Sequence, residues 1–204
     1  MSTGHVLTVC TGNVCRSPVM ERVLQAAVDE RWGPGAIEVS SAGTHALVGE
    51  AVDTLALREL TAMGADGTGF AARRLESRMV RRADLVLTAT RRHRSAVVQL
   101  HPQAMRRTFA VLDLADTAAH LGVEDLPDTD DPGTWLREVV ATAAARRGLT
   151  PPLSAQDADV VDPYRRAPEV YQEMGRQLGA ALPAVAWLLT GRSPGRSPDR
   201  PSAG

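Results

Sequence analysis

The sequence contains no lysine, so all 23 of its basic side chains are arginines. These arginines are scattered along the 204-residue chain, and we interpret their exclusive use as a compositional bias. The 24 acidic side chains bring the formal net charge to −1, which gives no indication of nucleic acid as a partner. Aromatic residues are also rare, at 3%, so we expect a core built mainly from Val, Leu and Ala.

Long hydrophobic runs are absent as well. No stretch approaches the roughly 18 apolar residues of a membrane span, and Met1–His5 does not begin the basic-then-apolar pattern of a signal peptide. The sequence therefore predicts no membrane insertion and a cytoplasmic location. Cysteine is limited to Cys10 and Cys15, five positions apart. Because a structural disulfide usually joins distant segments, we expect both thiols to be free.

The chain also lacks any sequence cluster of metal-ligating side chains. Its five histidines are dispersed, and we expect them on the surface or in loops. We therefore expect no metal and no other cofactor. The histidines are His5, His45, His93, His101 and His120.

The most informative stretch that is present is Cys10–Pro18, which reads Cys-Thr-Gly-Asn-Val-Cys-Arg-Ser-Pro. It follows a short Val-rich strand pattern and leads into a helical pattern that begins at Pro18 or Val19. A loop in this position directs backbone N–H groups and the positive end of the helix dipole at one point, which creates an anion site. The thiol of Cys10 and the guanidinium of Arg16 at that point predict phosphate chemistry with a cysteine nucleophile.

Each residue of the loop has a physical role in this prediction. Cys10 attacks only as a thiolate, which the loop amides and Arg16 favour. The planar fork of Arg16 matches two phosphate oxygens. Ser17 is placed to donate a hydrogen bond to the sulfur, and Asn13 either braces the loop through its side chain or adopts a left-handed backbone. The predicted phosphate-binding residues are Thr11, Gly12, Asn13, Val14, Cys15, Arg16 and Ser17.

Strand patterns alternate with helical patterns along the first 120 residues. This alternation predicts an α/β fold with a parallel sheet, in which ligands bind beyond the carboxyl ends of the strands. The Cys10 loop would lie at such an end. The expected strands are 5–9, 37–40, 84–88 and 108–112.

The remainder of the chain differs in composition. An acidic cluster at 124–131 precedes a helical pattern at 134–147, and we interpret 122–159 as a surface insertion with one helix. We expect a single domain over 1–190, with an Arg/Ser/Pro/Gly-rich disordered tail at 191–204.

The loop resembles the signature of the low molecular weight protein-tyrosine phosphatases. Ser41–Thr44 resembles the segment that this family carries after its second strand, and Asp162–Tyr164 resembles its general-acid loop. The resemblance covers about residues 5–189 and is interrupted by 122–159. It implies a four-stranded parallel sheet of order 2-1-3-4 with helices on both faces (phosphotyrosine phosphatase I-like). It also implies an enzyme that acts on phosphorylated proteins, above all on phosphotyrosine, without metal or cofactor.

The resemblance also assigns catalytic roles. Cys10 would attack the phosphorus and form a cysteinyl-phosphate, with Arg16 gripping the phosphate. Asp162 would protonate the leaving phenol and then act as base for the hydrolytic water. Asp157 and Asp159 lie close by in the sequence, so the choice of Asp162 depends on the family pattern.

Further roles follow from the same resemblance. Ser41 would join Asn13 and Ser17 in supporting the loop through hydrogen bonds. Cys15 would capture an oxidised Cys10 as a reversible disulfide, although it also suits a packing role as a small buried residue.

The residues expected at the rim of the site do not decide which phosphorylated side chain is the substrate. We expect Leu47, Tyr164 and Arg165 to form it, and the family often has aromatic residues where Leu47 and Arg165 stand here. A Thr in place of Val14 is associated with phosphoarginine, whereas the methyl groups of Val14 favour an aromatic leaving group. A protein-arginine phosphatase is the nearer alternative, and an inactive phosphoprotein-binding module is the alternative from another class.

Overall fold

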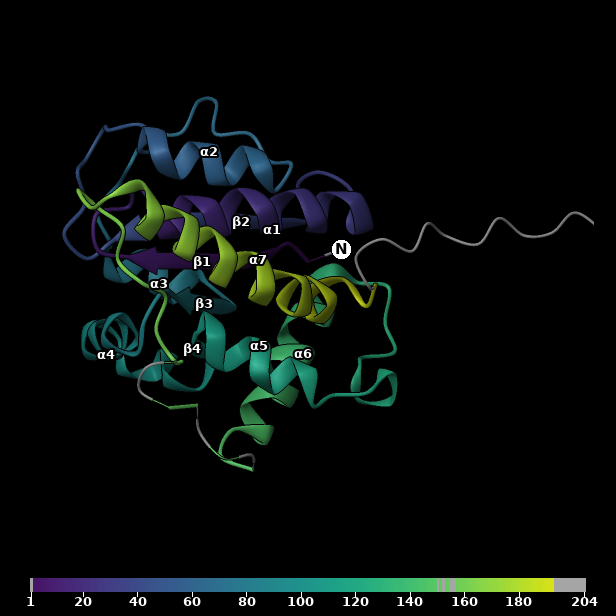
Figure 1. The fold of residues 1–204 in the computed structure, drawn as a ribbon. Helices are drawn as coiled ribbons and strands as arrows, with labels where there is room; N and C mark the ends of the chain where they lie inside the picture. Colours follow the sequence, from purple (N-terminus) through teal and green to yellow (C-terminus); the bar gives the residue numbers. More distant parts are fainter. Residues whose placement is uncertain (1, 150, 152, 155–156, 193–204) are drawn as a thin grey trace, which may run out of the picture.

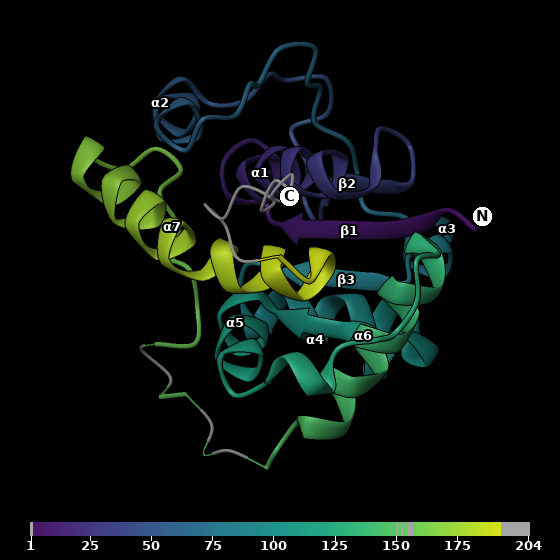
Figure 2. The ribbon, with the colours of Figure 1, turned by 90° about the vertical axis from the view of Figure 1, so that its right-hand side faces the viewer.

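Four parallel strands form the centre of the molecule, and helices surround them (Figures 1 and 2). The computed structural model describes residues 2–149, 151, 153–154 and 157–192. The predicted tail lies outside this part of the chain from residue 193 onward. The elements are β1 (Gly4–Cys10), α1 (Arg16–Trp32), β2 (Ile37–Gly43), α2 (Thr54–Ala62), α3 (Ser77–Arg82), β3 (Leu85–Thr88), α4 (Arg91–Leu100), η1 (Pro102–Arg107), β4 (Thr108–Ala110), α5 (Val111–Ala119), η2 (Val123–Asp125), α6 (Pro132–Arg146) and α7 (Pro168–Thr190).

The sheet has the strand order β2-β1-β3-β4. In the register of the central strand, Cys10 at the end of β1 lies beside Gly43 at the end of β2. The predicted order 2-1-3-4 and the parallel arrangement are confirmed. The Cys10 loop leaves the carboxyl end of a central strand, where ligands bind in sheets of this kind.

Alternate residues of the strands serve two separate apolar clusters, as the two-residue period of a strand requires. Val6 and Leu85 belong to the larger cluster, which includes residues of α1, α5 and α7. Leu7 and Val86 belong to a smaller cluster with residues of α3, α4 and η1. Helices therefore cover both faces, as expected. Figure 1 shows α7 crossing in front of the sheet between α1 and α5, and it packs against both.

The prediction of a surface insertion is wrong for α6. Leu136, Val139 and Ala143 are fully buried on one side of this helix and belong to the larger cluster. The indole Nε1 of Trp135 donates to the carbonyl oxygen of Leu188 at 3.1 Å, which ties α6 to the end of α7. Leu136 also packs where a Cβ atom of Gly4 would point, so α6 lies beside the amino end of β1. The helix thus completes the core at the end of the sheet remote from the Cys10 loop.

Predicted boundaries also need correction. Strand β2 extends to Gly43, beyond the predicted end at residue 40. Helix α1 begins at Arg16, earlier than the expected Pro18 or Val19, so the guanidinium is already part of the first helical turn. Strand β4 ends at Ala110, and the chain enters α5 directly at Val111, which the sequence patterns had placed in a strand. Short apolar runs fit either element, and here the burial of one face of α5 decides for the helix. Within the described ranges, no helix is both long enough and apolar enough to cross a membrane.

Candidate active site

The loop between β1 and α1 turns its backbone carbonyl groups outward. The carbonyl oxygens of Cys10, Thr11 and Gly12 accept hydrogen bonds of 2.9–3.0 Å from backbone N–H groups in the segment 44–47. Within each trans peptide unit the C=O group and the N–H group point in opposite directions. Because these C=O groups point outward, the N–H groups of the same peptide units face the inside of the loop. None of the N–H groups of residues 12–15 donates to a backbone carbonyl that the structure describes. The loop therefore presents converging donors to an anion.

The end of β2 lies directly against this loop. A Cβ atom on Gly43 would stand 2.4 Å from the carbonyl oxygen of Thr11 and 3.0 Å from the amide nitrogen of Asn13. Any larger residue would push the loop outward, so this close approach requires glycine. Asn13 itself has a φ of 58°, in the left-handed region that asparagine tolerates better than most residues. The curvature of the loop depends on both positions.

A buried hydrogen-bond network supports the loop from behind. Nδ2 of Asn13 donates to the hydroxyl oxygens of Ser17 at 2.9 Å and Ser41 at 2.7 Å. Oδ1 of Asn13 accepts from the backbone N–H of Arg73 at 2.8 Å. The hydroxyl of Ser17 also lies 3.0 Å from Sγ of Cys10. The structure thus brings together the three residues predicted to support the loop, and it places the Ser17 hydroxyl within hydrogen-bonding distance of the Cys10 sulfur.

Arg16 reaches the mouth of the loop from the first turn of α1. Its side chain is 4% exposed, and Nη1 donates to the carbonyl oxygen of Val160 at 3.2 Å. Nη2 lies 2.9 Å from Oδ2 of Asp162. Its Nε is buried and has no hydrogen-bond partner among the described residues. The guanidinium is therefore fixed in place while it retains a donor for an oxyanion.

The three neighbouring aspartates have different partners. Asp159 accepts a hydrogen bond of 2.7 Å from the first backbone N–H of α4, and Asp157 accepts one of 2.6 Å from a serine hydroxyl. Asp162 instead pairs with Arg16 and is 55% exposed. Of the three, Asp162 is the carboxylate that pairs with the loop guanidinium, and its role as the general acid stays a prediction.

One histidine does not lie where the sequence analysis expected it. His93 is 7% exposed on α4, with Nε2 2.8 Å from the hydroxyl of Thr11 and Nδ1 2.7 Å from that of Thr90. Burial, reinforced by the charge of Arg16, lowers the pKa of His93 to about 4, so it is neutral at pH 7. Thr11 and His93 are 82 residues apart in the sequence, so no local pattern could have shown this contact. Among the described residues, no three or more His, Cys, Asp or Glu side chains are placed to hold a metal ion.

A recess of about 680 Å³ opens beside Arg16 and Asp162. One wall comes from α4, along most of its length from Arg92 to Gln99, and no Phe, Tyr or Trp is among the described residues that line the recess. The predicted rim residues are not part of this lining either. The lining residues that the sequence analysis did not anticipate are Thr44, His45, Thr90, Arg92, His93, Ser95, Ala96 and Gln99.

The predicted rim residues lie close to the loop but outside that lining. Leu47 is half-buried, and its side chain stands 3.9 Å from where a Cβ atom of Gly12 would be. Tyr164 is half-buried against the core, with the guanidinium of Arg165 5.2 Å from its ring centroid. Their assignment as a substrate rim stays a prediction.

Cys15 is buried beneath the loop as a free thiol. Burial, together with the nearby carboxylate of Asp53, raises the pKa of Cys15. The packing role expected for it therefore agrees with the structure. Its role as redox partner of Cys10 stays a prediction. The raised pKa does not favour this role, because a protonated thiol attacks an oxidised sulfur more slowly than a thiolate does.

The sheet and the loop together define a class of protein. It is an α/β protein whose central strand ends in a cradle of N–H donors, with a thiol at its base and a guanidinium at its mouth. Residues 5–148 match the family model described as low molecular weight phosphotyrosine protein phosphatase, and the chain belongs to that family.

Curated relatives agree with this membership. Etp from Escherichia coli (strain K12) is 37% identical over 104 residues, which cover 51% of this chain and 66% of Etp. Wzb from Salmonella typhimurium is 39% identical over 98 residues, which cover 48% of this chain and 62% of Wzb. Both are named low molecular weight protein-tyrosine-phosphatases. The matched region thus spans slightly less than two thirds of these relatives.

Solved structures share the fold over nearly their whole length. Vibrio vulnificus Wzb in complex with benzylphosphonate superposes with a TM-score of 0.61 at 24% identity, covering 90% of this chain and 97% of Wzb. The YwlE arginine phosphatase from Geobacillus stearothermophilus gives 0.64 at 24% identity, covering 92% and 94%. The tyrosine phosphatase Wzb from Escherichia coli K30 gives 0.61 at 24% identity, covering 89% of this chain and 95% of Wzb, so one fold serves proteins named for two different phosphorylated side chains.

Proposed function

We propose that this chain is a cysteine-dependent protein phosphatase that hydrolyses phosphomonoesters, with phosphotyrosine as its main target. The observation that carries the proposal is the convergence of Cys10, Ser17, Arg16 and Asp162 on one loop of inward N–H groups. A phosphoryl group in that loop meets a thiol from below and a carboxyl group from above. The names of the curated relatives support the same reaction.

The first half-reaction transfers the phosphoryl group to sulfur. The thiolate of Cys10 attacks phosphorus, and the S–P bond forms while the bond from phosphorus to the phenolic oxygen breaks. Arg16 and the inward N–H groups stabilise the charge on the equatorial oxygens. Asp162 gives its proton to the leaving oxygen.

The second half-reaction releases phosphate. Asp162, now a carboxylate, accepts a proton from a water molecule whose oxygen attacks the phosphorus. The P–S bond breaks, and Cys10 leaves as a thiolate that the hydroxyl of Ser17, 3.0 Å away, stabilises. The products are tyrosine and inorganic phosphate, and the enzyme returns to its starting state.

The test is the substitution Cys10→Ser. We expect the hydrolysis of para-nitrophenyl phosphate and of phosphotyrosine peptides, in buffer containing a chelator, to fall by at least about 10⁴-fold. Circular dichroism would confirm that the variant is folded. Full activity of the variant would contradict the cysteinyl-phosphate mechanism. A wild-type chain that binds phosphotyrosine peptides but never turns them over would instead be an inactive binding module.

Protein-arginine phosphatase is the second candidate, and the polar lining of the recess favours it. His93, Asp159 and Asp162 line the recess, whereas no Phe, Tyr or Trp of the described residues does so. Val14 favours the aromatic leaving group, because it is buried in the loop and has no hydroxyl. Rates on matched phosphotyrosine and phosphoarginine peptides decide between the two. Faster phosphoarginine hydrolysis would change the substrate and leave the role of Cys10 intact.

The proposal extends to the setting of the enzyme. We infer that residues 1–190 fold as one domain, because the larger apolar cluster joins the sheet to α6 and α7. A cytoplasmic location suits a nucleophile that must remain a free thiol, as Cys10 is here. Phosphorylated proteins are the partners that this reaction requires.

A further inference from the structure

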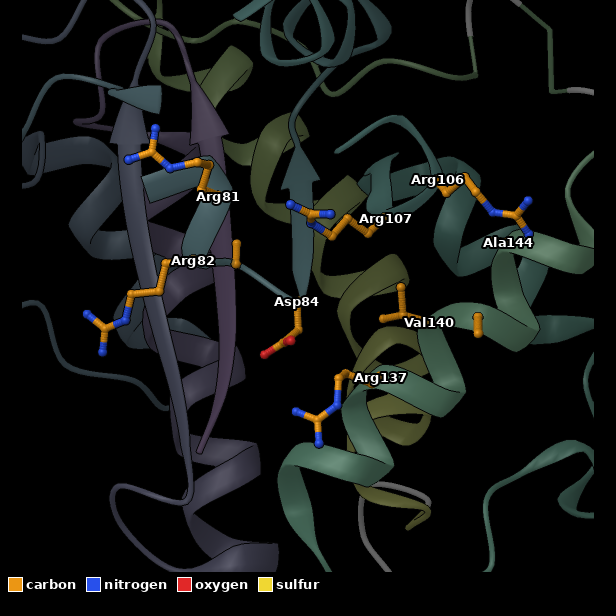
Figure 3. Close-up of a pocket in the computed structure, with 10 residues that line it drawn as sticks. Arg81, Arg82, Asp84, Arg106, Arg107, Arg137, Val140 and Ala144 are labelled. Carbon is orange, nitrogen blue, oxygen red and sulfur yellow. The ribbon is translucent and has the colours of Figure 1, made fainter. Parts of the chain in front are cut away.

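A second recess, of about 380 Å³, lies at the amino ends of the strands (Figure 3). It is bounded by α3, the start of β3, η1 and α6, and its apolar lining includes Val140 and Ala144. Its lining gathers arginines that are scattered in the sequence. They are Arg81, Arg82, Arg106, Arg107 and Arg137.

Carboxylates neutralise only part of this charge. Arg82 pairs with Glu38 at 2.9 Å. Asp84 is the acidic residue of the lining, and its carboxylate accepts a hydrogen bond of 2.9 Å from the backbone N–H of His5. None of the other four arginines forms an ion pair with a carboxylate that the structure describes. The recess therefore carries a concentrated positive charge in a protein whose formal net charge is −1.

The hydrogen bonds of these arginines are weak or lead to neutral groups. Arg107 reaches two backbone carbonyl oxygens, each at 3.4 Å, and its buried Nε has no partner among the described residues. Arg137 donates to two hydroxyl groups, at 3.1 and 3.3 Å. In Figure 3, Arg107 extends from η1 toward β3, whereas the guanidinium groups of Arg82 and Arg137 turn away from it. Arg107 and Arg137 thus both line the recess, and each guanidinium has more N–H donors than its hydrogen bonds use.

The size and chemistry of the recess select a class of ligand. Guanidinium groups bind phosphate oxygens in pairs, and several phosphate groups are needed to match several arginines. A volume of about 380 Å³ exceeds the needs of a single phosphate ion. The methyl groups of Val140 and Ala144 offer contact to a non-polar part of the ligand. A recess of this volume accommodates a small molecule.

We propose that this recess binds a small organic molecule that carries two or more phosphate groups, held by Arg107 and Arg137 with Arg81 and Arg106 at the edge. The site is independent of the Cys10 loop, which lies at the other end of the strands.

Tripolyphosphate is a suitable probe, followed by ¹⁵N–¹H NMR of the whole chain at constant ionic strength. We expect amide shifts at Ala83 and Ala144 that saturate separately from any shift at Gly12 in the active-site loop. Arg107→Gln and Arg137→Gln, made singly, should each weaken the binding reported by Ala83 and Ala144 about tenfold. The shift at Gly12 reports on the active-site loop in the same experiment.

Arg58→Gln is the matched control, because it removes the same charge from an exposed position on α2. It should leave the affinity reported by Ala144 unchanged. Shifts confined to Gly12, or equal weakening by Arg58→Gln and Arg107→Gln, would overturn the proposal. Inorganic phosphate that binds as tightly as tripolyphosphate would contradict the requirement for several phosphate groups.

Discussion

The two ends of the sheet hold their arginines in opposite ways. At the carboxyl end, the Arg16 side chain is 4% exposed and is held by Val160 and Asp162. At the amino end, four of the five arginines of the second recess are exposed, and Arg107 makes only long hydrogen bonds. A guanidinium that is already fixed loses little conformational entropy when a phosphate binds. Its hydrogen bonds to the phosphate can therefore stabilise the transition state without that cost. Exposed arginines lose that entropy on binding, which suits recognition and not chemistry.

The two sites also differ in how the chain assembles them. The active-site loop draws its donors, thiol and guanidinium from residues 10–17, so local backbone geometry fixes most of the site. The second recess combines side chains from α3, η1 and α6 with Asp84 just before β3, and it exists only because α6 packs beside the amino ends of the strands. A site of the first kind is encoded locally, and one of the second kind depends on tertiary packing.

The largest expected effect is at the carboxyl end of the sheet, where Asp162 is the proposed proton donor. We expect Asp162→Asn to lower kcat on phosphotyrosine peptides by about 10²–10³-fold, because the leaving phenolate then departs without a proton. The loss should be much smaller for an aryl phosphate whose phenol is strongly acidic. Single-turnover kinetics on both substrates measure the contrast.

The matched control is Asp159→Asn, which keeps an oxygen acceptor for the first N–H of α4. We expect its effect on kcat to be less than about threefold. If Asp159→Asn were the more damaging change, the acid would have to be reassigned to Asp159.

His93 gives a second test, through stability. Its pKa falls from the ordinary 6.5 to about 4 in the folded chain, so the unfolded state binds more protons between those values. The contribution of His93 to stability is therefore complete above pH 6.5 and is lost as the pH falls toward 4. The loss is on the order of 3 kcal/mol. Urea unfolding at pH 7, 5.5 and 4.5 should show a shallower pH dependence for His93→Asn. An unchanged slope would show that His93 is not held neutral.

Much of the fold followed from sequence patterns, and the errors have a common origin. Strand and helix periodicities revealed the alternation of elements, and the resemblance supplied the sheet order. The apolar spacing of Leu136, Val139 and Ala143 indicated a helix but not which surface it would cover, and this led to the wrong placement of α6. Val111 fits a strand as well as a helix when read alone, and packing decided the outcome. In both cases the missing information was tertiary.

The same limit applies to the candidate site. Cys10, Arg16 and Ser17 were predicted as a unit because they are close in sequence. His93 is far from these residues in the sequence, so no local pattern could show that its ring reaches the hydroxyl of Thr11. The arginines of the second recess went unrecognised for the same reason, since a scattered distribution in sequence says little about distances in space.

Salt gives the smallest of the expected effects and bears directly on the contrast between the two ends. Mobile ions screen exposed charges far more than buried ones. Between 50 and 200 mM sodium chloride, we expect the affinity of the second recess for tripolyphosphate to fall about tenfold. The inhibition constant of inorganic phosphate at the Cys10 loop should change by less than about threefold, because its donors are buried and many are neutral amides. Equal salt sensitivity at both sites would show that burial of Arg16 does not separate them electrostatically.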